Sequence, residues 1–526
     1  MNCLYILAAP STVGKSTLLQ RFILEKTNSK LSWCGVNKYS TRDCRGTDSE
    51  GITDDVIDID NRTDELRSAR TNYEKYKKLI GSNDQEELQK KIAYEDLIKE
   101  RFQYIKNYCG DQSKGVAYHM NANIYGFNYQ EIADCLKNNN AALICSNFDA
   151  ILELKNNKQF GNRVQVIYIA SSMDERIFLS RFKIRMEGSE SIFNLTPAEL
   201  EEFEEHHRLM HFEKSEEKDF QMKDLWSEYN STIQKRKEEI RILFEHYINN
   251  IGIVDHVILN FYDLEYMYKQ MREVIKKNNE CKTLIRKSNV PIFMVCAAPS
   301  SGKGTLMEIV GDTRKVGDSI LRVKKYTKCE RSPWTNRRDN IEPIGNDGTF
   351  ENYIPANAMW AWKGHRTHGH CACVERECAV NLEEMQKNMM SKKAQIFIAD
   401  FQEIEYAREL FPENIVILYL HATHNSATMK HITRKRTKEI REEIAKDAKE
   451  KEKLILNDNE IYKRVITEPC KTALEKKIQA DLKEIRAIHE QYAEFIGHVD
   501  HVLLNTGTQN DLALQMRKLL KEYGCI

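Results

Sequence analysis

Two glycine–lysine loops constrain this chain more than any other feature. AAPSTVGKST occupies residues 8–17, and AAPSSGKGT occupies residues 297–305. Each follows a short apolar run, NCLYILA at 2–8 and VPIFMVC at 290–296, and the first is followed by helical periodicity in TLLQRFILEK. A short apolar run of this kind is typical of a buried parallel strand. The sequence therefore predicts two strand–loop–helix units.

Other matched segments indicate that the whole plan is repeated. IGIVDHVILN at 251–260 and IGHVDHVLLN at 496–505 are identical at eight of ten positions. KYSTRDCR at 38–45 has a shorter counterpart in KYTKCER at 325–331. Because the matched segments occur in the same order, we interpret the chain as a tandem duplication.

The alternation of strands and helices predicts the fold class. A chain of 526 residues is too long for one core. We predict α/β architecture, with two tandem domains that each have a mainly parallel sheet flanked by helices. Further buried strands are expected in AALICSNF and VQVIYIA, and in AQIFIADF and NIVILYLH of the second half. The predicted boundaries are a first domain at 1–275 with a helical insert near 61–108, a linker at 276–290, and a second, divergent domain at 291–526.

Composition excludes some classes of protein. Lys plus Arg number 79 and Asp plus Glu also number 79, which gives no support to a nucleic-acid-binding protein. No apolar run approaches the roughly 20 residues that a membrane span needs. The start, MNCLYILAAPS, has no basic segment of the kind that opens a secretion signal. We therefore expect a soluble cytoplasmic protein whose 14 cysteines are mostly free thiols.

The loops have the chemistry of a phosphate site. Backbone N–H groups at a helix N-terminus favour an anion, and a lysine neutralises phosphate oxygens. Lys15 and Lys303 are the candidate lysines, and Ser16 and Thr305 are the candidate Mg²⁺ ligands. The predicted ATP-binding loops comprise Ala9, Pro10, Ser11, Thr12, Val13, Gly14, Lys15, Ser16 and Thr17, and Ala298, Pro299, Ser300, Ser301, Gly302, Lys303, Gly304 and Thr305. The alternative is an ordinary strand-to-helix turn with a surface lysine.

The first half resembles the guanylate kinase family over most of residues 1–275, which implies that the two tandem domains are P-loop kinase domains. APSTVGKST resembles that family's loop, whereas AAPSSGKGT looks more like the adenylate kinase version. By this resemblance STRDCR implies that Arg42 and Arg45 hold the acceptor phosphate, and NANIYGFNYQ places Tyr125 beside it. DERIFLSRFKIR resembles the lid helix, so Arg181 and Arg185 would clamp the transferring group. VDHVILN implies that Asn260 lies near the adenine of ATP, and Asn505 is its counterpart.

The second half is more divergent. Lys328 and Arg331 stand in for Arg42 and Arg45, and ITRKR offers Arg434 and Arg436 as lid residues. Asp400 falls near a carboxylate position of the family. His368-Gly369 is aligned with Tyr125-Gly126.

Departures from the family concern the acceptor. Val116 and Cys145 are aligned with the two carboxylates that read guanine, and Lys38 replaces a serine that contacts the acceptor phosphate. GMP is therefore doubtful as the substrate of the first half. Another nucleotide or a ribosyl phosphate is an alternative acceptor.

The stretch GHRTHGHCACVEREC is dense in potential metal ligands, namely His365, His368, His370, Cys371, Cys373 and Cys378. Its spacing matches no paired Cys-x-x-Cys site, so we favour a substrate-facing loop over a zinc site. Trp360 and Trp362 just before it are candidates for base stacking or for core packing.

The function predicted from sequence is ATP- and Mg²⁺-dependent phosphoryl transfer to a nucleoside monophosphate or a similar phosphate acceptor. Lys15, Arg181, Arg185, Lys303, Arg434 and Arg436 are the expected catalytic residues, and Lys38, Arg42, Arg45, Tyr125, Arg331 and Asp400 the expected acceptor-binding residues. Nucleotides are the expected partners, with no nucleic acid and no membrane. The alternatives are a non-catalytic nucleotide- or protein-binding module, or one active and one regulatory half.

Overall fold

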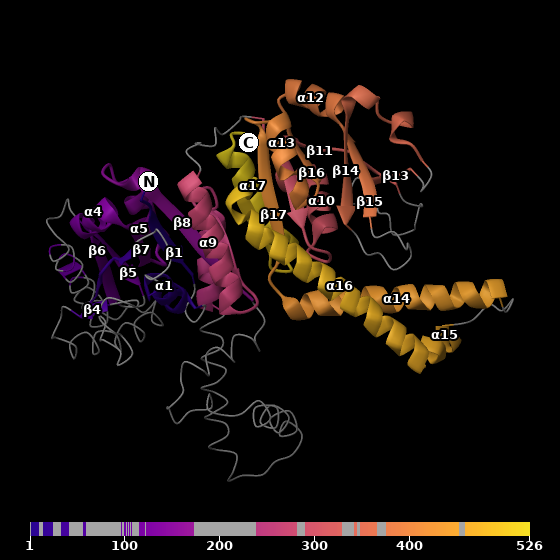
Figure 1. Cartoon of the computed structure of the whole chain (residues 1–526), viewed down its shortest axis with the longest axis horizontal. Helices are drawn as coiled ribbons and strands as arrows, with labels where there is room; N and C mark the ends of the chain where they lie inside the picture. The colour runs from indigo at the N-terminus through magenta and orange to yellow at the C-terminus, as the bar shows by residue number, and fades with distance from the viewer. Residues whose placement is uncertain are drawn as a thin grey trace, which may run out of the picture. The chain divides into compact units, whose positions relative to one another are not determined.

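The structure is a computed structural model that describes residues 2–9, 14–24, 33–40, 56–58, 96, 99, 100, 103, 105, 107, 115–120, 123–172, 238–280, 290–328, 341–344, 348–365, 375–451, 458–465 and 467–526. These residues form two compact units. The first contains strands β1 to β9 and the second contains β10 to β18 (Figure 1).

The core of the first unit is a five-stranded sheet in the order β2-β7-β1-β8-β9. Its strands are β2 (Trp33–Gly35), β7 (Asn140–Ile144), β1 (Leu4–Ala8), β8 (Val164–Ser171) and β9 (His256–Asn260). β1 pairs in parallel with both β7 and β8, and every residue of β1 is buried. A strand that is covered on both faces reads as a continuous apolar run, which explains LYILA.

The second unit repeats this sheet in the order β11-β16-β10-β17-β18. Its strands are β11 (Ile320–Arg322), β16 (Ala394–Ile398), β10 (Ile292–Ala297), β17 (Ile415–Ala422) and β18 (His501–Asn505). β10 pairs in parallel with β16 and β17. β10 is thus the counterpart of β1, as the two loops predict.

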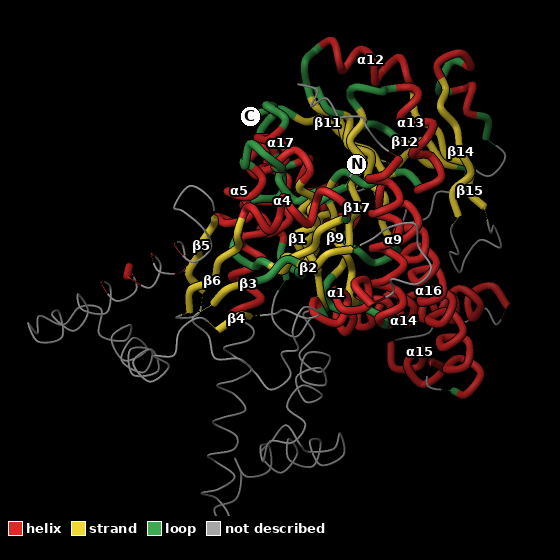
Figure 2. The backbone as a smooth tube through the Cα atoms, turned by 60° about the vertical axis from the view of Figure 1, so that its left-hand side comes forward, coloured by secondary structure: helices red, strands yellow, loops and turns green. Residues whose placement is uncertain are grey.

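Each unit also has a four-stranded sheet, seen apart from the larger one in the first unit in Figure 2. In the first unit the order is β4 (Val56–Asp58), β3 (Lys38–Ser40), β6 (Asn123–Asn128) and β5 (Gly115–Met120). In the second it is β13 (Ile341–Pro343), β12 (Lys325–Thr327), β15 (Glu375–Asn381) and β14 (Met359–His365). The two sheets share their order, their one parallel pair and their antiparallel pairs.

An asparagine cap links each small sheet to the helix that follows it. The Asn128 side chain accepts hydrogen bonds from the first amides of α4 (Tyr129–Asn138), and Asn381 does the same for α12 (Leu382–Met390). An amide oxygen in this position satisfies N–H groups that have no intrahelical acceptor. The local sequence therefore specifies where both helices begin.

The remaining helices flank the two large sheets or connect strands. In the first unit they are α1 (Lys15–Leu24), α5 (Phe148–Lys155), a helix at 238–249 and the short η1 (Gly161–Arg163), and α9 (Leu264–Glu280) follows β9. In the second they are α10 (Lys303–Gly311), α11 (Thr313–Val316), α13 (Ile404–Leu410), α14 (Asn425–Lys451), α15 (Asp458–Val465), α16 (Glu468–Phe495) and α17 (Gln509–Glu522), with short η4 (Phe350–Asn352), η5 (Ala356–Ala358), η6 (Phe401–Glu403) and η7 (Ile496–His498). α14, α15 and α16 form an arm that projects from the second unit (Figure 1).

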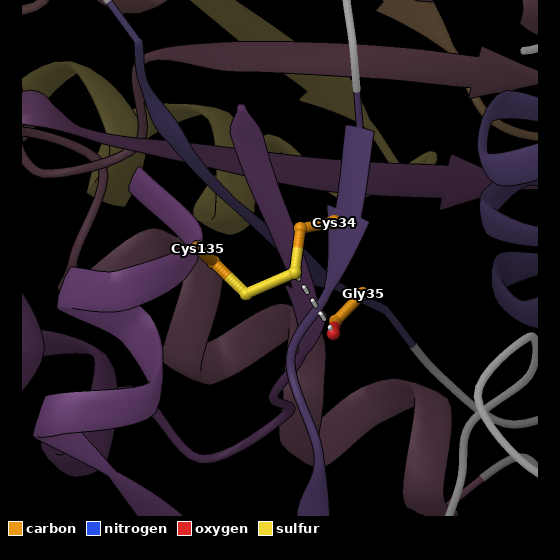
Figure 3. Close-up of a disulfide and its surroundings, with 3 residues drawn as sticks. All are labelled: Cys34, Gly35 and Cys135. Atoms are coloured by element: carbon orange, nitrogen blue, oxygen red, sulfur yellow. Dashed lines mark hydrogen bonds between the residues drawn. A yellow bond between two sulfur atoms is a disulfide. The ribbon is translucent and has the colours of Figure 1, made fainter. Parts of the chain in front are cut away.

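A disulfide joins Cys34 of β2 to Cys135 of α4 in the first unit (Figure 3). Their Cα atoms lie 5.7 Å apart, within the usual range for a disulfide. This pair is an exception to the expectation that the cysteines are mostly free thiols. The other cysteines that the structure describes are thiols outside any disulfide: Cys3, Cys145, Cys296, Cys378, Cys470 and Cys525.

The predicted fold class is confirmed, since both units are α/β with a mainly parallel sheet flanked by helices. Within the insert near 61–108, only scattered residues at 96–107 are described, and they are helical. Most of the predicted linker at 276–290 lies outside the described ranges, so the boundaries stay predictions. Over the part of the chain that the structure describes, no helix is both long enough and apolar enough to cross a membrane.

Candidate functional site

The first loop ends at the start of α1. The Leu18 N–H donates to the Gly14 carbonyl at 2.9 Å, which is the first hydrogen bond of the helix. The amides of residues 14–17 therefore precede that bond, and such amides are available to an anion. The Lys15 Nζ donates to the Ala9 carbonyl at 2.8 Å, so the lysine lies across the loop. Residues 10–13 lie outside the described ranges.

The second loop is described in full and has the same hydrogen bonds as those described for the first. The Leu306 N–H donates to the Gly302 carbonyl at 2.9 Å, so the amides of residues 302–305 precede the first bond of α10. The Lys303 Nζ donates to the Ala297 carbonyl at 3.0 Å and to the Ala298 carbonyl at 3.1 Å. Lys15 and Ala9 have the same separation in sequence as Lys303 and Ala297, and the same hydrogen bond joins each pair.

Glycine is required at the last loop position before each lysine. Gly14 has φ +80° and Gly302 has φ +103°, a region that side chains with a Cβ rarely adopt. A Cβ on Gly302 would also lie 2.3 Å from the Asn505 Nδ2. Ser300, at φ +60°, adds a second left-handed residue to this loop. Left-handed residues of this kind let successive N–H groups line a concavity that suits an anion.

The residues of the second loop fit a phosphate group. The Ser301 hydroxyl is buried and has no hydrogen-bond partner among the described residues. A buried hydroxyl without a partner is costly, which indicates that a ligand or water completes it. Of the predicted Mg²⁺ ligands, Thr305 is half-buried in the first turn of α10, whereas the Ser16 side chain is outside the described part.

The small sheet of the first unit has one packed face and one face with polar and aromatic groups. Tyr39, Ala117 and Ile124 form the packed cluster. Alternate residues point to the opposite face. That face holds Lys38, which is buried and has its Nζ 4.9 Å from the ring centroid of Tyr125. Both predicted acceptor residues that are described here therefore lie together.

The small sheet of the second unit is built in the same way. Tyr326 and Ala379 belong to its packed cluster, so Lys325, Thr327 and Trp362 share the other face. The Lys325 Nζ lies 6.0 Å from the Trp362 ring centroid. Sequence reasoning did not single out Lys325, although the repeated Lys-Tyr dipeptide at 38 and 325 was the available signal.

A buried tryptophan and a carboxylate meet beside this face. Trp360 is 1% exposed, and its Nε1 donates to the Glu403 Oε2 at 2.9 Å. Burial raises the pKa of Glu403, with the Trp360 hydrogen bond acting in the opposite direction and the charge of Asp400 adding to the rise. Trp360 also contacts the rings of Phe397 and Tyr406. Of the two roles proposed for Trp360 from the sequence, core packing is the one the structure supports.

Strand register corrects one equivalence that the sequence suggested. Tyr39 pairs with Gly126, and Tyr326 pairs with Ala379. The counterpart of Tyr125-Gly126 is therefore Cys378-Ala379 and not His368-Gly369. The sequence misled because the histidine stretch offers a His-Gly pair, similar to Tyr-Gly, ten residues before the true counterpart.

Strand register also shows which residues correspond at the strand end next to each loop. β1 and β10 pair with β7 and β16 so that Ala141 corresponds to Gln395. The residue that corresponds to Asp400 is therefore Ser146, one position after Cys145. Ser146 donates from its Oγ to the Ala9 carbonyl at 3.0 Å, so in the first unit this position supports the loop.

The two arginines predicted for the lid of the second unit point in different directions. Arg434 is exposed on α14, whereas Arg436 is 2% exposed. Residues two apart in a helix lie on nearly opposite sides. The Arg436 Nε donates to the Asp481 Oδ2 at 2.7 Å and its Nη1 to the Glu439 Oε2 at 2.6 Å. Arg436 is thus engaged within the arm.

Several predicted site residues lie outside the described ranges and stay predictions. These are Pro10, Ser11, Thr12, Val13, Arg42, Arg45, Arg181, Arg185 and Arg331. Lys328 is described, and its Nζ pairs with the Glu377 Oε2 at 2.5 Å. Residues 366–374 of the histidine and cysteine stretch are likewise outside. No group of three or more potential metal ligands occurs among the residues that are described.

Comparisons with known proteins add little to this geometry. No protein-family model matches the chain, and no curated protein matches it. Among solved structures the chain is similar to the guanylate kinase from Anaplasma phagocytophilum, with 13% sequence identity and a TM-score of 0.27, covering 53% of this chain and 88% of that one. This similarity is too low to support a conclusion about activity.

Proposed function

We propose that the chain transfers the γ-phosphoryl group of ATP to a nucleoside monophosphate or a similar phosphate-bearing acceptor. The observation that carries this proposal is the repeated loop geometry. In each unit the loop lysine donates a hydrogen bond from its Nζ to a backbone carbonyl near the end of the preceding strand. The backbone N–H groups at the start of the following helix come before the first hydrogen bond of that helix. A lone surface lysine after a turn would have no reason to repeat that contact.

The loops would act through charge and position. Phosphoryl transfer depends on neutralising phosphate oxygens and aligning the acceptor more than on covalent chemistry. Lys15 and Lys303 would turn from the carbonyls of Ala9 and Ala297 to phosphate oxygens. Mg²⁺ would supply positive charge that neutralises the phosphate oxygens. Ser16 and Thr305 are the residues we assign to hold it.

The small sheets would hold the acceptor. Lys38 and Lys325 are buried cations on the faces opposite the packed clusters, beside Tyr125 and Trp362 respectively. A cation on such a face suits an anionic group of the acceptor. Arg42, Arg45 and Arg331 are assigned to the same acceptor, and Arg181 and Arg185 to the transferring group. A phosphate acceptor is already ionised at neutral pH, so no general base is required.

The first unit does not offer guanine a pair of carboxylates at the aligned positions. Val116 and Cys145 are both buried, and Ser146 is engaged with Ala9. A guanine edge left without acceptors would be costly to bury. We therefore expect GMP to be a poor acceptor for the first unit.

A screen of ATP against AMP, CMP, UMP, dTMP and GMP tests the proposal. We expect phosphoryl transfer to at least one acceptor other than GMP, and we expect the Lys15→Ala variant to lose that transfer. Transfer to none of them by the parent chain would favour the second candidate, a nucleotide- or protein-binding module. Rapid transfer to GMP alone that depends on Lys15 would show that the acceptor assignment is wrong.

A further inference from the structure

The side-chain amide of Asn505 forms hydrogen bonds at both ends, one with the second loop and one with its own turn. Asn505 ends β18, and its Nδ2 donates to the Ser301 carbonyl at 2.8 Å. Its Oδ1 accepts from the Gly507 N–H at 2.9 Å. Both ends of the amide are therefore committed within the protein. A further contact with a nucleotide base would have to use the second N–H or the second lone pair of an amide that these two hydrogen bonds already hold in one orientation.

The backbone of Asn505 is held as firmly as its side chain. Its carbonyl accepts from the Thr423 N–H at 3.0 Å and from the Thr423 Oγ1 at 3.1 Å. Thr423 follows β17, directly before the arm that begins with α14. Asn505 therefore joins the loop to the ends of two neighbouring strands, which gives its amide a fixed position.

The bond to Ser301 orients a peptide unit that faces the phosphate site. A trans peptide is planar, so its C=O and N–H point in opposite directions. When the Ser301 carbonyl is held toward Asn505, the Gly302 N–H must point away from it. Gly302 is the first of the amides that precede the first hydrogen bond of α10. Asn505 thereby sets the direction of a donor in the proposed anion site.

Steric contact reinforces this arrangement. A Cβ on Gly302 would lie 2.3 Å from the Asn505 Nδ2, against 3.7 Å between a Cβ on Gly14 and the Asn260 Nδ2 in the first unit. The second loop is therefore packed against its asparagine more closely than the first.

We propose that Asn505 is a positioning residue, which orients the Ser301–Gly302 peptide toward the triphosphate and does not read adenine. This inference rests on the proposed nucleotide binding at the second loop. It changes the role expected from the sequence, where Asn505 was assigned to the adenine region.

The test compares a ligand with a base and a ligand without one. We would measure the Kd of Mg²⁺–ATP and of Mg²⁺–tripolyphosphate by calorimetry in the full chain carrying Lys15→Ala, so that binding reports the second loop. We expect Asn505→Ala to weaken both ligands by the same factor, on the order of 5- to 10-fold, as for loss of one hydrogen bond. Gln509→Ala, which removes an exposed amide at the start of α17, is the matched control and should change neither.

Two results would overturn the inference. One is an Asn505→Ala variant that binds ATP less tightly but tripolyphosphate as before, because that is the signature of a base-reading residue. The other is no change for either ligand.

Hydrogen exchange without ligand separates this inference from the proposed function. We expect faster exchange in the peptide covering 298–306 for Asn505→Ala, and also for Asn505→Ser, a milder change to use where the alanine variant does not fold. If the Lys15→Ala parent binds neither ligand, nucleotide binding at the second loop is wrong, and the exchange result alone then judges whether Asn505 orders the loop. Unchanged exchange in both variants would overturn the positioning role.

Discussion

Arg436 of α14 and Asp481 of α16 form a buried ion pair in which the guanidinium donates to both carboxylate oxygens. Glu439 accepts a further hydrogen bond from the same guanidinium. The pair lies inside the arm, where the side chains of Arg436 and Asp481 are 2% and 5% exposed. The arginine that the sequence offered as a clamp for phosphate is therefore part of the contact that holds two helices together.

Removing the carboxylate should destabilise the arm. We expect Asp481→Ala to lower the free energy of unfolding by about 3–5 kcal/mol, because it leaves a buried cation with only Glu439. Glu443→Ala is the matched control, since Glu443 pairs with Lys477 but is 41% exposed, and it should cost at most about 1 kcal/mol. Urea unfolding followed by circular dichroism measures both. Equal losses for the two variants would contradict the buried pair.

Reduction should loosen the first unit. The Cys34–Cys135 disulfide closes a loop with a sequence separation of 101 residues. Removing such a constraint from the unfolded chain typically costs 2–5 kcal/mol of stability. We expect dithiothreitol to lower the unfolding midpoint of the parent to that of a Cys34→Ser, Cys135→Ser double variant, and to leave the double variant unchanged. Peptide mapping that finds both thiols free under oxidising conditions would remove the basis for this prediction.

A buried histidine pair should make the second unit sensitive to acid. The rings of His421 and His489 lie 5.0 Å apart. Burial lowers the pKa of His489 to about 4, and burial together with the charge of His489 lowers the pKa of His421 well below its ordinary value. A lowered folded-state pKa means that the unfolded chain takes up protons first. The contribution of the two neutral histidines to the free energy of unfolding is therefore fully present above about pH 6.5, and it is lost as the pH falls toward 4.

Calorimetry of the parent and of His489→Gln at pH 7.5 and pH 5.5 tests this. One such histidine costs about 1.4 kcal/mol of stability per pH unit below about pH 6.5, and so about 1.4 kcal/mol in total between pH 7.5 and pH 5.5. We expect the unfolding midpoint of the parent to fall more between the two pH values than that of His489→Gln. An equal fall would show that other groups govern the acid response.

Sequence reasoning located both large sheets because their central strands are buried on two faces. LYILA and IFMVCA are continuous apolar runs, and the glycine–lysine loops mark where those strands end. The loop lysines and Gly302 could be predicted because phosphate chemistry demands those residue types at that place.

The parts that could not be predicted depend on contacts between distant segments. Trp360 meets Glu403 only because β14 and η6 are brought together by the fold, and Asp481 lies 45 residues from Arg436. The partner of a charged residue on a helix is not visible in its own sequence. Strand register also depends on contacts between distant segments. For this reason the sequence did not show that Cys378, rather than His368, is the counterpart of Tyr125.

Transfer of labelled γ-phosphoryl by the full chain, compared between Lys15→Ala and Lys303→Ala, is the most direct test of the proposed activity. Ser16 follows Lys15 directly, whereas Gly304 follows Lys303, so the first loop has the better-placed hydroxyl for Mg²⁺. We expect Lys15→Ala to lower turnover by about 100-fold or more, since one preorganised charge in such a site is worth that much, and Lys303→Ala to leave most of the turnover. Turnover of Lys15→Ala within a factor of about two of the parent, at the same acceptor, would contradict the assignment of the first unit as the transferring one.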